Sequence, residues 1–456
     1  MFVLGAFALF AQDSLQIAKD TNVVSQAIIP ISTDTIATKP VMGTDSTAIL
    51  NNIPTPPLTI PEIAPLKQQS YQVPTVNPQD ADTTLNFVNV ETITYAQFLG
   101  QFWDELVVTG EKALNKHIDY YYLRLRLGVA YFQLQKFRAA EQQFNKAMQF
   151  NSEDPFLKEY LYFTYLKNAH YEQALKLSAS FDNTLKTRTV GTDMPISLLY
   201  AESGGKISNN DQIFSNAFYL QAGIGHRLTK YLNITHAYTN YNQQAFYGKV
   251  TQKQYYLGAK IPIKKTWLIN PAFHLVTFDV ASPPSTKFPY YKTPTKTVNG
   301  IVAAINLQKT FTYFDIAAGY AYATLNDSIQ QQENIQMNIY PWANNKFSIG
   351  ANVTIQQRNG INKNTFGYNF NTTYAPHWKF KISASYFMGD LKNNTEDNGF
   401  VVNNSYYVTT NRITLTPQIA ITKKIDAYMM YQYENKALYN YTLQYNNFFV
   451  GLKYKF

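Results

Sequence analysis

The chain ends in NNFFVGLKYKF, residues 446–456, and this stretch decides which fold the sequence predicts. Successive side chains of a strand point to opposite faces, so the apolar residues of this stretch share one face. They are Phe448, Val450, Leu452, Tyr454 and Phe456. The other face carries Asn447, Gly451, Lys453 and Lys455. Such a strand needs apolar surroundings on one side and tolerates water on the other, as in a soluble sandwich or in a barrel within lipid.

The same period of two runs through residues 190–456. In FSIGANVTIQ, residues 347–356, apolar side chains alternate with Ser, Gly, Asn and Thr, and WKFKISASYFM, residues 378–388, repeats the pattern. Runs of this kind predict about fourteen strands of ten to sixteen residues. Strands of that length cross an apolar band when they tilt by about 45°.

The connections between these runs distinguish the two alternatives. Tight links such as LTKY, PIKKTW and TKKID alternate with longer polar segments such as YNQQAFYGK and GDLKNNTEDNGFVVNN. Outer-membrane barrels have short turns at one end and longer loops at the other, whereas a sandwich gives no reason for this alternation. The fold class predicted is therefore α+β multidomain, with an antiparallel up-and-down barrel at 190–456. Because lipid cannot satisfy an open sheet edge, the last strand should pair with the first, near MPISLLYAES at 194–203.

Composition agrees with a barrel. The chain of 456 residues has 36 Tyr and 30 Phe but only 45% hydrophobic residues, as expected where polar and apolar side chains alternate and aromatic residues line both interfaces. The apolar stretch FVLGAFALFA is half the length of a spanning helix, and it predicts a signal peptide at 1–11. The absence of cysteine excludes disulfides and thiolate metal sites.

Two segments precede the predicted barrel. Residues 12–90 are rich in Pro and Thr and have no sustained period, which predicts a disordered linker that serves either as a spacer or as a docking strip. Residues 91–185 have a helical period. Within them, YYLRLRLGVAYFQLQKFRAAEQQFNKAMQFNSEDP, residues 121–155, places small and aromatic residues where two antiparallel helices pack closely. These residues are Gly128, Tyr131, Phe137, Ala140, Phe144 and Ala147.

This unit resembles a tetratricopeptide repeat. A shift by one repeat length brings Tyr165, Tyr171 and Ala174 onto the places of Tyr131, Phe137 and Ala140. The resemblance implies a short helical array that binds a protein partner.

The terminal strand resembles the C-terminal recognition strand of bacterial outer-membrane proteins, which is read by the outer-membrane assembly machinery. In architecture the chain is similar to polysaccharide-export porins such as the exporter of poly-N-acetylglucosamine. This similarity implies the outer membrane of a Gram-negative-type bacterium, with the helical region in the periplasm.

Charge is unevenly distributed along the chain. Residues 190–456 hold 24 Lys and Arg against 12 Asp and Glu, whereas residues 1–189 hold 15 against 18. Many of the basic residues flank the short turns, and they predict a basic rim at the periplasmic end of the barrel: Arg227, Lys260, Lys264, Lys265, Lys379, Lys381, Lys423, Lys424, Lys453 and Lys455. This rim either contacts anionic lipid headgroups or attracts an anionic cargo or the acidic helical domain.

The predicted lumen face is mostly Asn, Thr, Gln, Ser and Gly, with Asp315 and Asp426 as its acids, and it suits neutral polar solutes better than cations. The six histidines are scattered, and no Ser-His-Asp set, His-x-x-x-His pair or phosphate loop is visible. The sequence therefore predicts no enzyme, no cofactor or metal site and no binding of nucleic acid.

Two functions remain open at this point. The first is an outer-membrane channel for transport or export of a polar or anionic solute or polymer, whose helical repeats recruit a periplasmic or outer-membrane protein. The alternative is a non-transporting scaffold subunit of an envelope complex, in which the barrel is an anchor in the outer-membrane lipids. A channel must leave an aqueous path through the lumen, whereas an anchor can be filled by its own loops. Both GDLKNNTEDNGFVVNN and ASPPSTKFPYYKTPTK are long enough to fold inward.

Overall fold

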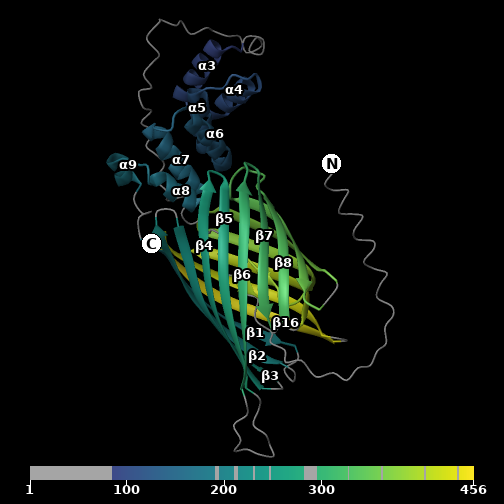
Figure 1. Cartoon of the computed structure of the whole chain (residues 1–456). Helices are drawn as coiled ribbons and strands as arrows, with labels where there is room; N and C mark the ends of the chain where they lie inside the picture. Colours follow the sequence, from purple (N-terminus) through teal and green to yellow (C-terminus); the bar gives the residue numbers. More distant parts are fainter. Residues whose placement is uncertain are drawn as a thin grey trace, which may run out of the picture. The chain divides into compact units, whose positions relative to one another are not determined.

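The computed structural model describes residues 85–189, 195–209, 214–229, 232–245, 248–281, 295–326, 328–360, 363–404, 407–438 and 441–456. The predicted signal peptide at 1–11 lies outside these residues, as does the predicted linker up to residue 84. Figure 1 shows a helical region followed along the chain by a barrel of long strands.

The helical region consists of α3 (Phe87–Leu99), α4 (Trp103–Asn115), α5 (Tyr121–Gln133), α6 (Phe137–Phe150), α7 (Pro155–Lys167), α8 (Tyr171–Ser178) and α9 (Asn183–Arg188). The first helices of successive pairs begin at equal intervals along the chain, at Phe87, Tyr121 and Pro155. The same interval recurs in the turns within the pairs, where Gln101, Gln135 and Ala169 each have positive φ. Helix α3 begins inside the last residues of the predicted linker, because Asn86 caps it by accepting a hydrogen bond from the backbone N–H of Asn89.

The helix pairs pack through contacts of small residues with large ones. A Cβ at Gly128 of α5 would lie 2.4 Å from the Phe144 ring of α6, so only glycine permits this approach. Ala140, Phe144 and Ala147 are fully buried, whereas Tyr131 and Phe137 are partly buried against the same core. Among the described helices, none is long and apolar enough to cross a membrane.

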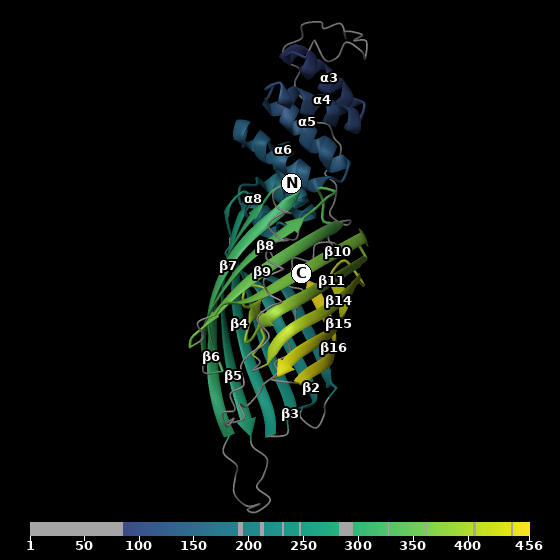
Figure 2. The same ribbon diagram turned by 90° about the vertical axis from the view of Figure 1, so that its right-hand side faces the viewer.

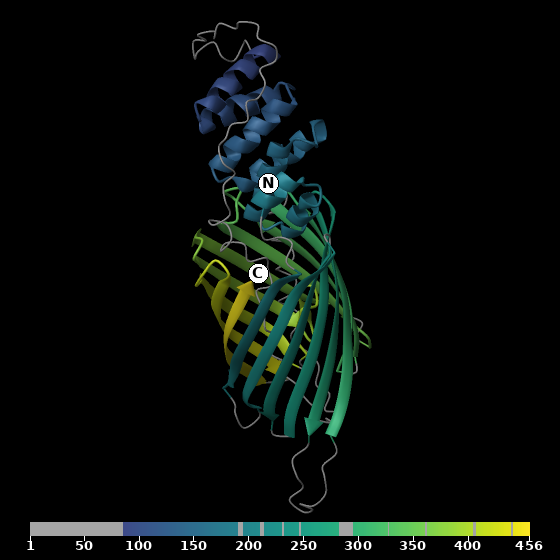
Figure 3. The ribbon, with the colours of Figure 1, turned by 90° about the vertical axis from the view of Figure 1, so that its left-hand side faces the viewer.

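The barrel is closed and contains fourteen antiparallel strands, which confirms the predicted fold class. Its strands are β1 (Ile196–Ser208), β2 (Phe214–Thr229), β3 (Leu232–Ala245), β4 (Gly248–Lys264), β5 (Trp267–Ala281), β6 (Thr295–Thr310), β7 (Phe314–Leu325), β8 (Ser328–Ile339), β9 (Phe347–Arg358), β10 (Thr365–His377), β11 (Phe380–Leu391), β14 (Val408–Ala420), β15 (Ile425–Leu438) and β16 (Tyr441–Lys455). Figures 2 and 3 show from two sides how these strands are inclined around the barrel.

Pairing of β16 with β1 closes the barrel, as the sequence predicted. Leu199 lies opposite Tyr454 and Gly205 lies opposite Phe448, so the pairing runs along most of both strands. Of the residues predicted as the assembly signal, Phe448, Val450, Leu452 and Phe456 are exposed on the outer face, and Tyr454 is partly exposed. The intervening Phe449, Gly451 and Lys453 face the lumen and are buried.

Aromatic rings in the lumen lie on glycines of neighbouring strands. A Cβ at Gly223 would lie 2.2 Å from the Tyr200 ring, and a Cβ at Gly451 would lie 2.2 Å from the Tyr428 ring. The outer face of the barrel carries exposed apolar side chains. Leu220, Ile335 and Met429 are each about half exposed or more. The glycines thus give room for large side chains inside the barrel.

The connections at the two ends of the barrel differ less in length than the sequence predicted. One end has the short turns that join β2 to β3, β4 to β5, β6 to β7, β8 to β9, β10 to β11 and β14 to β15, and it is called the short-turn end below. At the opposite end, the prediction that YNQQAFYGK forms a long loop is wrong, because β3 continues to Ala245 and β4 begins at Gly248. The polar residues of this segment belong to β3 and β4, because the two strands pair up to Ala245 and Gly248.

We predict that Gly223→Ala destabilises the barrel by about 1–3 kcal/mol, because the added methyl group must displace the Tyr200 ring within a packed lumen. Gly205→Ala is the control, since the nearest atom to its Cβ would be the Ala217 carbonyl oxygen at 3.7 Å. Thermal unfolding measured by gel mobility compares the two variants, and equal midpoints would contradict the packing role of Gly223.

Candidate functional site: the occluded lumen

The connection between β11 and β14 folds into the lumen. It forms a small two-stranded sheet of β12 (Thr395–Glu396) and β13 (Val401–Val402), and residues 392–404 are called the lumen hairpin below. Three consecutive residues at its tip, Asp397, Asn398 and Gly399, have positive φ, a conformation that Asp, Asn and Gly adopt most readily. Phe400, Val401 and Val402 are at most 3% exposed, so the hairpin is packed against the wall.

Glutamine side chains of the wall pair with the backbone of the lumen hairpin. Gln356 of β9 donates to the Lys392 carbonyl at 2.7 Å and accepts from the Lys392 N–H at 3.3 Å. Gln332 of β8 accepts from the Thr395 N–H at 3.0 Å and donates to the Thr395 carbonyl. A primary amide presents a donor and an acceptor side by side, so these glutamines act like the edge of another strand.

Other parts of the wall hold the remaining hairpin residues. Arg412 of β14 donates to both carboxylate oxygens of Glu396 at 2.7 Å. At the tip, the Asn398 amide donates to the Asn270 carbonyl of β5 at 2.6 Å. Phe400 packs edge-on against Tyr256 of β4, with ring centroids 4.6 Å apart. The hairpin therefore reaches several sides of the lumen through polar contacts, while Phe400, Val401 and Val402 pack against apolar residues of the wall.

A buried charged cluster fills the lumen beside the base of the hairpin. Glu434 lies 3.7 Å from the Lys436 ammonium and 4.0 Å from that of Lys206, and all three side chains are fully buried. Lys436 also lies 3.4 Å from Asn403 of the hairpin. The prediction that Asp315 and Asp426 are the lumen acids was thus incomplete, because Glu202 and Glu434 are also buried there. Both residues stand at inward-facing positions in the alternating pattern of β1 and β15, and this pattern could have identified them from the sequence.

Contacts between the helical region and the barrel lie at the short-turn end. Arg138 of α6 forms a buried ion pair with Asp315 of β7. Its guanidinium also donates to the carbonyls of Phe311 and Thr312 at 2.7 and 2.9 Å, and it lies 3.9 Å from the centroid of the Tyr340 ring. This one side chain thus binds the β6–β7 turn, the start of β7 and the β8–β9 turn.

The other barrel side chains that contact the helical region near this ion pair bond to uncharged groups of the helices. Lys346 donates to the Gln135 side chain at 2.7 Å, Lys265 donates to the Asn145 carbonyl at 3.1 Å, and Thr312 donates to Gln142 at 2.7 Å. The hypothesis that the basic rim holds acids of the helical domain is not supported by these contacts. The ion pair between Arg138 and Asp315 has the opposite polarity, with the base on the helix and the acid on the barrel.

His170 lies in the turn before α8, beside the same end of the barrel. Its Nδ1 is 2.8 Å from a carboxylate oxygen of Glu141, which also accepts from the Asn168 amide at 2.7 Å. Burial lowers the pKa of His170, but the charge of Glu141 and its hydrogen bond outweigh burial and raise that pKa above its ordinary value. Glu141 therefore joins the α7–α8 turn to α6 most strongly when His170 is protonated.

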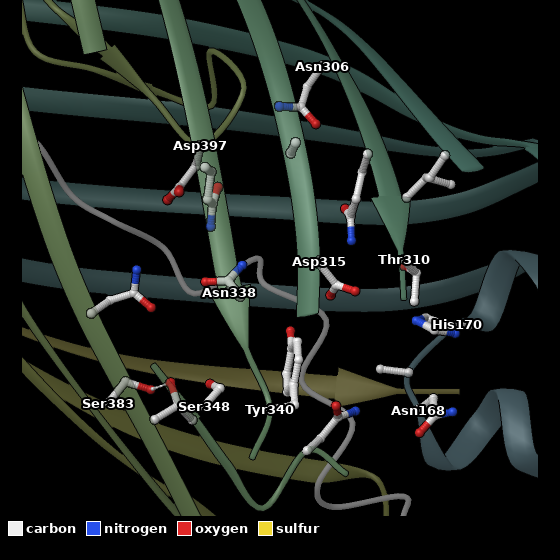
Figure 4. A pocket seen from close by; sticks show the side chains of 18 of the residues that line it. Asn168, His170, Asn306, Thr310, Asp315, Asn338, Tyr340, Ser348, Ser383 and Asp397 are labelled. Carbon is white, nitrogen blue, oxygen red and sulfur yellow. Dashed lines mark hydrogen bonds between the residues drawn. The ribbon is translucent and has the colours of Figure 1, made fainter. Parts of the chain in front are cut away.

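A polar cavity of about 400 Å³ lies between the α7–α8 turn and the lumen hairpin (Figure 4). The helical region contributes Arg138, Asn168 and His170, and the hairpin contributes Asp397. The barrel wall adds amides and hydroxyls, among them Asn306, Thr310, Asn338, Ser348 and Ser383, which Figure 4 labels around the cavity. The cavity is thus the part of the lumen that the hairpin and the helices leave unfilled.

The residues predicted as a basic rim occupy different environments. Lys260 and Lys381 line the cavity. Lys453 is buried 4.9 Å from the Tyr428 ring, and Lys455 pairs with Asp426. Lys379 and Lys424 lie over the rings of Trp378 and Tyr454. Lys264, Lys265 and Lys423 are exposed and Arg227 is partly exposed. In the described part of the chain, no group of three or more His, Asp or Glu residues is placed to hold a metal ion.

No protein-family model matches the chain, and no curated protein sequence matches it. Several solved structures are similar to part of the chain. The monoaromatic hydrocarbon channel CymD is 7% identical, with a TM-score of 0.42 over 58% of this chain and 90% of that one. The Ralstonia pickettii toluene transporter TbuX is 9% identical, with a TM-score of 0.39 over 58% and 90%. A bacterial polysaccharide outer membrane secretin is 10% identical, with a TM-score of 0.36 over 58% and 100%.

We predict that His170→Gln destabilises the helical region by about 1–3 kcal/mol at pH 5.5, because it removes a charged hydrogen bond to Glu141. A raised folded-state pKa contributes stability that is complete below the unfolded-state pKa and is lost as the pH rises through the folded-state value. The difference from the wild type should therefore shrink between pH 5.5 and pH 9. Urea unfolding followed by helical circular dichroism measures it, with the exposed His117→Gln as control. A difference that does not change with pH would refute the pairing.

We predict that Arg138→Met loosens the helical region from the barrel, because it leaves the buried Asp315 carboxylate without its partner. The native chain has no cysteine, so Gln142→Cys with Thr312→Cys provides a single crosslink that reports docking. Arg138→Met should slow disulfide formation severalfold, and adding Asp315→Leu should partly restore the rate. Arg124→Met is the control, since Arg124 pairs with Asp119 inside the helical region. Equal rates in all variants would exclude Arg138 as the docking residue.

Proposed function

We propose that the protein is an outer-membrane channel for a polar solute, with a lumen hairpin that closes the pore and a periplasmic helical region that covers its inner mouth. The outer face supports placement in lipid. Exposed apolar side chains such as Phe273, Ile305 and Leu415 recur on strands around the barrel. A soluble protein rarely exposes so much apolar surface, whereas a barrel in a bilayer requires it.

The lumen hairpin is the observation that carries this proposal. Its hydrogen bonds with Gln332, Gln356 and Arg412 join polar groups that water can also satisfy. A neutral hydrogen bond contributes only about 0.5–1.5 kcal/mol net, and one to a charged group such as that of Arg412 with Glu396 about 1.5–3 kcal/mol. Phe400, Val401 and Val402 pack into apolar clusters of the wall and add to the cost of leaving it. The many polar contacts of the hairpin nevertheless fit a closure that opens.

We further propose that the helical region is a tetratricopeptide array that recruits a periplasmic protein. The equal intervals between its helix pairs and the contact of Gly128 with Phe144 support this assignment. Phe87, Leu99, Phe102 and Val108 of α3, α4 and the turn between them are about half exposed, which gives a partner apolar surface to bury. The basic residues that lie over aromatic rings, Lys379 and Lys424, fit contacts with anionic headgroups.

We predict that replacing residues 394–403 with a short Gly-Ser turn raises single-channel conductance severalfold in a planar bilayer, because it removes the hairpin from the lumen. The control replaces residues 283–292, in the connection between β5 and β6, in the same way. Equal conductance in the wild type and in both variants would show that the hairpin does not close the pore. A current that rises only after removal of the hairpin supports the channel.

The buried cluster of Lys206, Glu434 and Lys436 favours the second candidate function, a scaffold subunit whose barrel is an anchor. Burying three ionisable groups is costly, and a permanently filled lumen is one reason to retain them. Under this alternative, the chain stays closed after removal of the hairpin, whereas the channel proposal expects it to open. Conductance of the hairpin-deleted form thus separates the two functions.

A further inference from the structure

We propose that asparagine side chains in the cavity form a binding site for an uncharged, polyhydroxylated solute of the carbohydrate class. This inference rests on the proposed channel function and specifies its cargo. The site, called the amide belt below, comprises Asn270 of β5, Asn306 of β6, Asn338 of β8 and Asn371 of β10.

Strand register brings these amides together in two pairs. Asn270 and Asn306 are direct partners on neighbouring strands, and their amides are 3.5 Å apart. Asn338 and Asn371 both lie opposite Gly350 of β9, one on each side. A Cβ at Gly350 would lie 2.1 Å from Oδ1 of Asn338 and 2.7 Å from Nδ2 of Asn371. The glycine thus leaves the space that these two amides occupy over the wall.

The amide belt has unused hydrogen-bonding capacity. Oδ1 of Asn270 has no hydrogen-bond partner within the protein, although it is closed off from solvent. The neighbouring hydroxyls of Thr373 and Ser383 bond to each other at 3.0 Å, and either can donate. Amides and hydroxyls both donate and accept, which matches the hydroxyl groups of a sugar. Such groups select their ligand by hydrogen bonding, since a ligand that lacks a hydroxyl leaves buried polar groups unpaired.

The charges around the cavity decide against an ionic cargo. Apart from His170, which pairs with Glu141, its bases are Arg138, Lys260 and Lys381 and its acids are Glu172, Asp315 and Asp397. These formal charges cancel, so the lining favours neither an anion nor a cation. Leu268 is the only aliphatic side chain larger than alanine among the lining residues, and Tyr340 is the only aromatic ring other than His170. Small-molecule sites are usually mostly apolar, so this lining also disfavours a hydrocarbon.

The volume agrees with a small solute or with a short section of a chain. About 400 Å³ lies within the range of about 300–1,000 Å³ for small-molecule sites. The lumen hairpin and the α7–α8 turn bound the cavity on two sides. A solute that moves along the lumen would therefore pass the amide belt between these two parts.

Equilibrium binding of maltotriose to the full-length protein tests this inference by titration calorimetry, in a zwitterionic detergent that has no sugar headgroup. The hairpin-deleted variant is titrated as well, so that a closed pore cannot hide the site. We expect maltotriose to bind at least tenfold more tightly than the cationic glucosamine trimer or the anionic galacturonate trimer. Absence of maltotriose binding in both proteins, or preference for a charged trimer, would overturn the proposal.

Two kinds of variant locate the site. Asn338→Leu with Asn371→Leu should weaken maltotriose binding at least tenfold, whereas Asn240→Leu with Asn242→Leu, on the outer face of β3, should leave it unchanged. Gly350→Ala should also weaken binding, because it displaces both amides without removing them, and Gly205→Ala is its control. Unchanged binding in the belt variants would place the site elsewhere and overturn the amide belt. These measurements need no conduction, so failure of the channel proposal and failure of the amide belt are distinguishable.

Discussion

Closure of the sheet is the constraint on which the rest of the structure depends. Every strand edge is paired, because β16 returns to β1 and leaves no row of free backbone groups. In lipid an unpaired edge would leave N–H and C=O groups without partners, at several kcal/mol each. Fourteen strands also enclose a lumen wide enough that wall side chains alone do not fill it everywhere. The lumen hairpin, the buried charged cluster and the cavity are three ways in which this chain occupies that space.

The filling of the lumen differs along its length. Aromatic rings on glycines, such as Tyr200 on Gly223, and the cluster around Glu434 leave little room at some levels. Around the amide belt, short side chains and Gly350 keep a cavity open. Polar groups make many of the hairpin contacts and most of the cavity wall, while Phe400, Val401 and Val402 bury apolar surface against the wall.

The helical region contacts the barrel through one buried ion pair and several hydrogen bonds in which the helix-side group is uncharged. Arg138 binds the carboxylate of Asp315 and two backbone carbonyls, so its loss leaves several buried acceptors unsatisfied. His170 and Glu141 stiffen the adjacent turn, which lines the same cavity. Docking of the helices and the shape of the cavity are therefore linked through neighbouring residues.

The sequence by itself determined the elements whose periods are local. Alternation in FSIGANVTIQ and in the terminal strand gave strands with a polar and an apolar face, and the recurring helical unit gave the helix pairs. The need to pair every edge then predicted the contact of β16 with β1. Inward parity could also have identified Glu202 and Glu434 as lumen acids. Only the tertiary structure decided that residues 392–404 turn inward and that Arg138 reaches Asp315. A polar loop has no period that encodes its direction, and an ion pair between residues 177 positions apart depends on where the whole barrel places its turns.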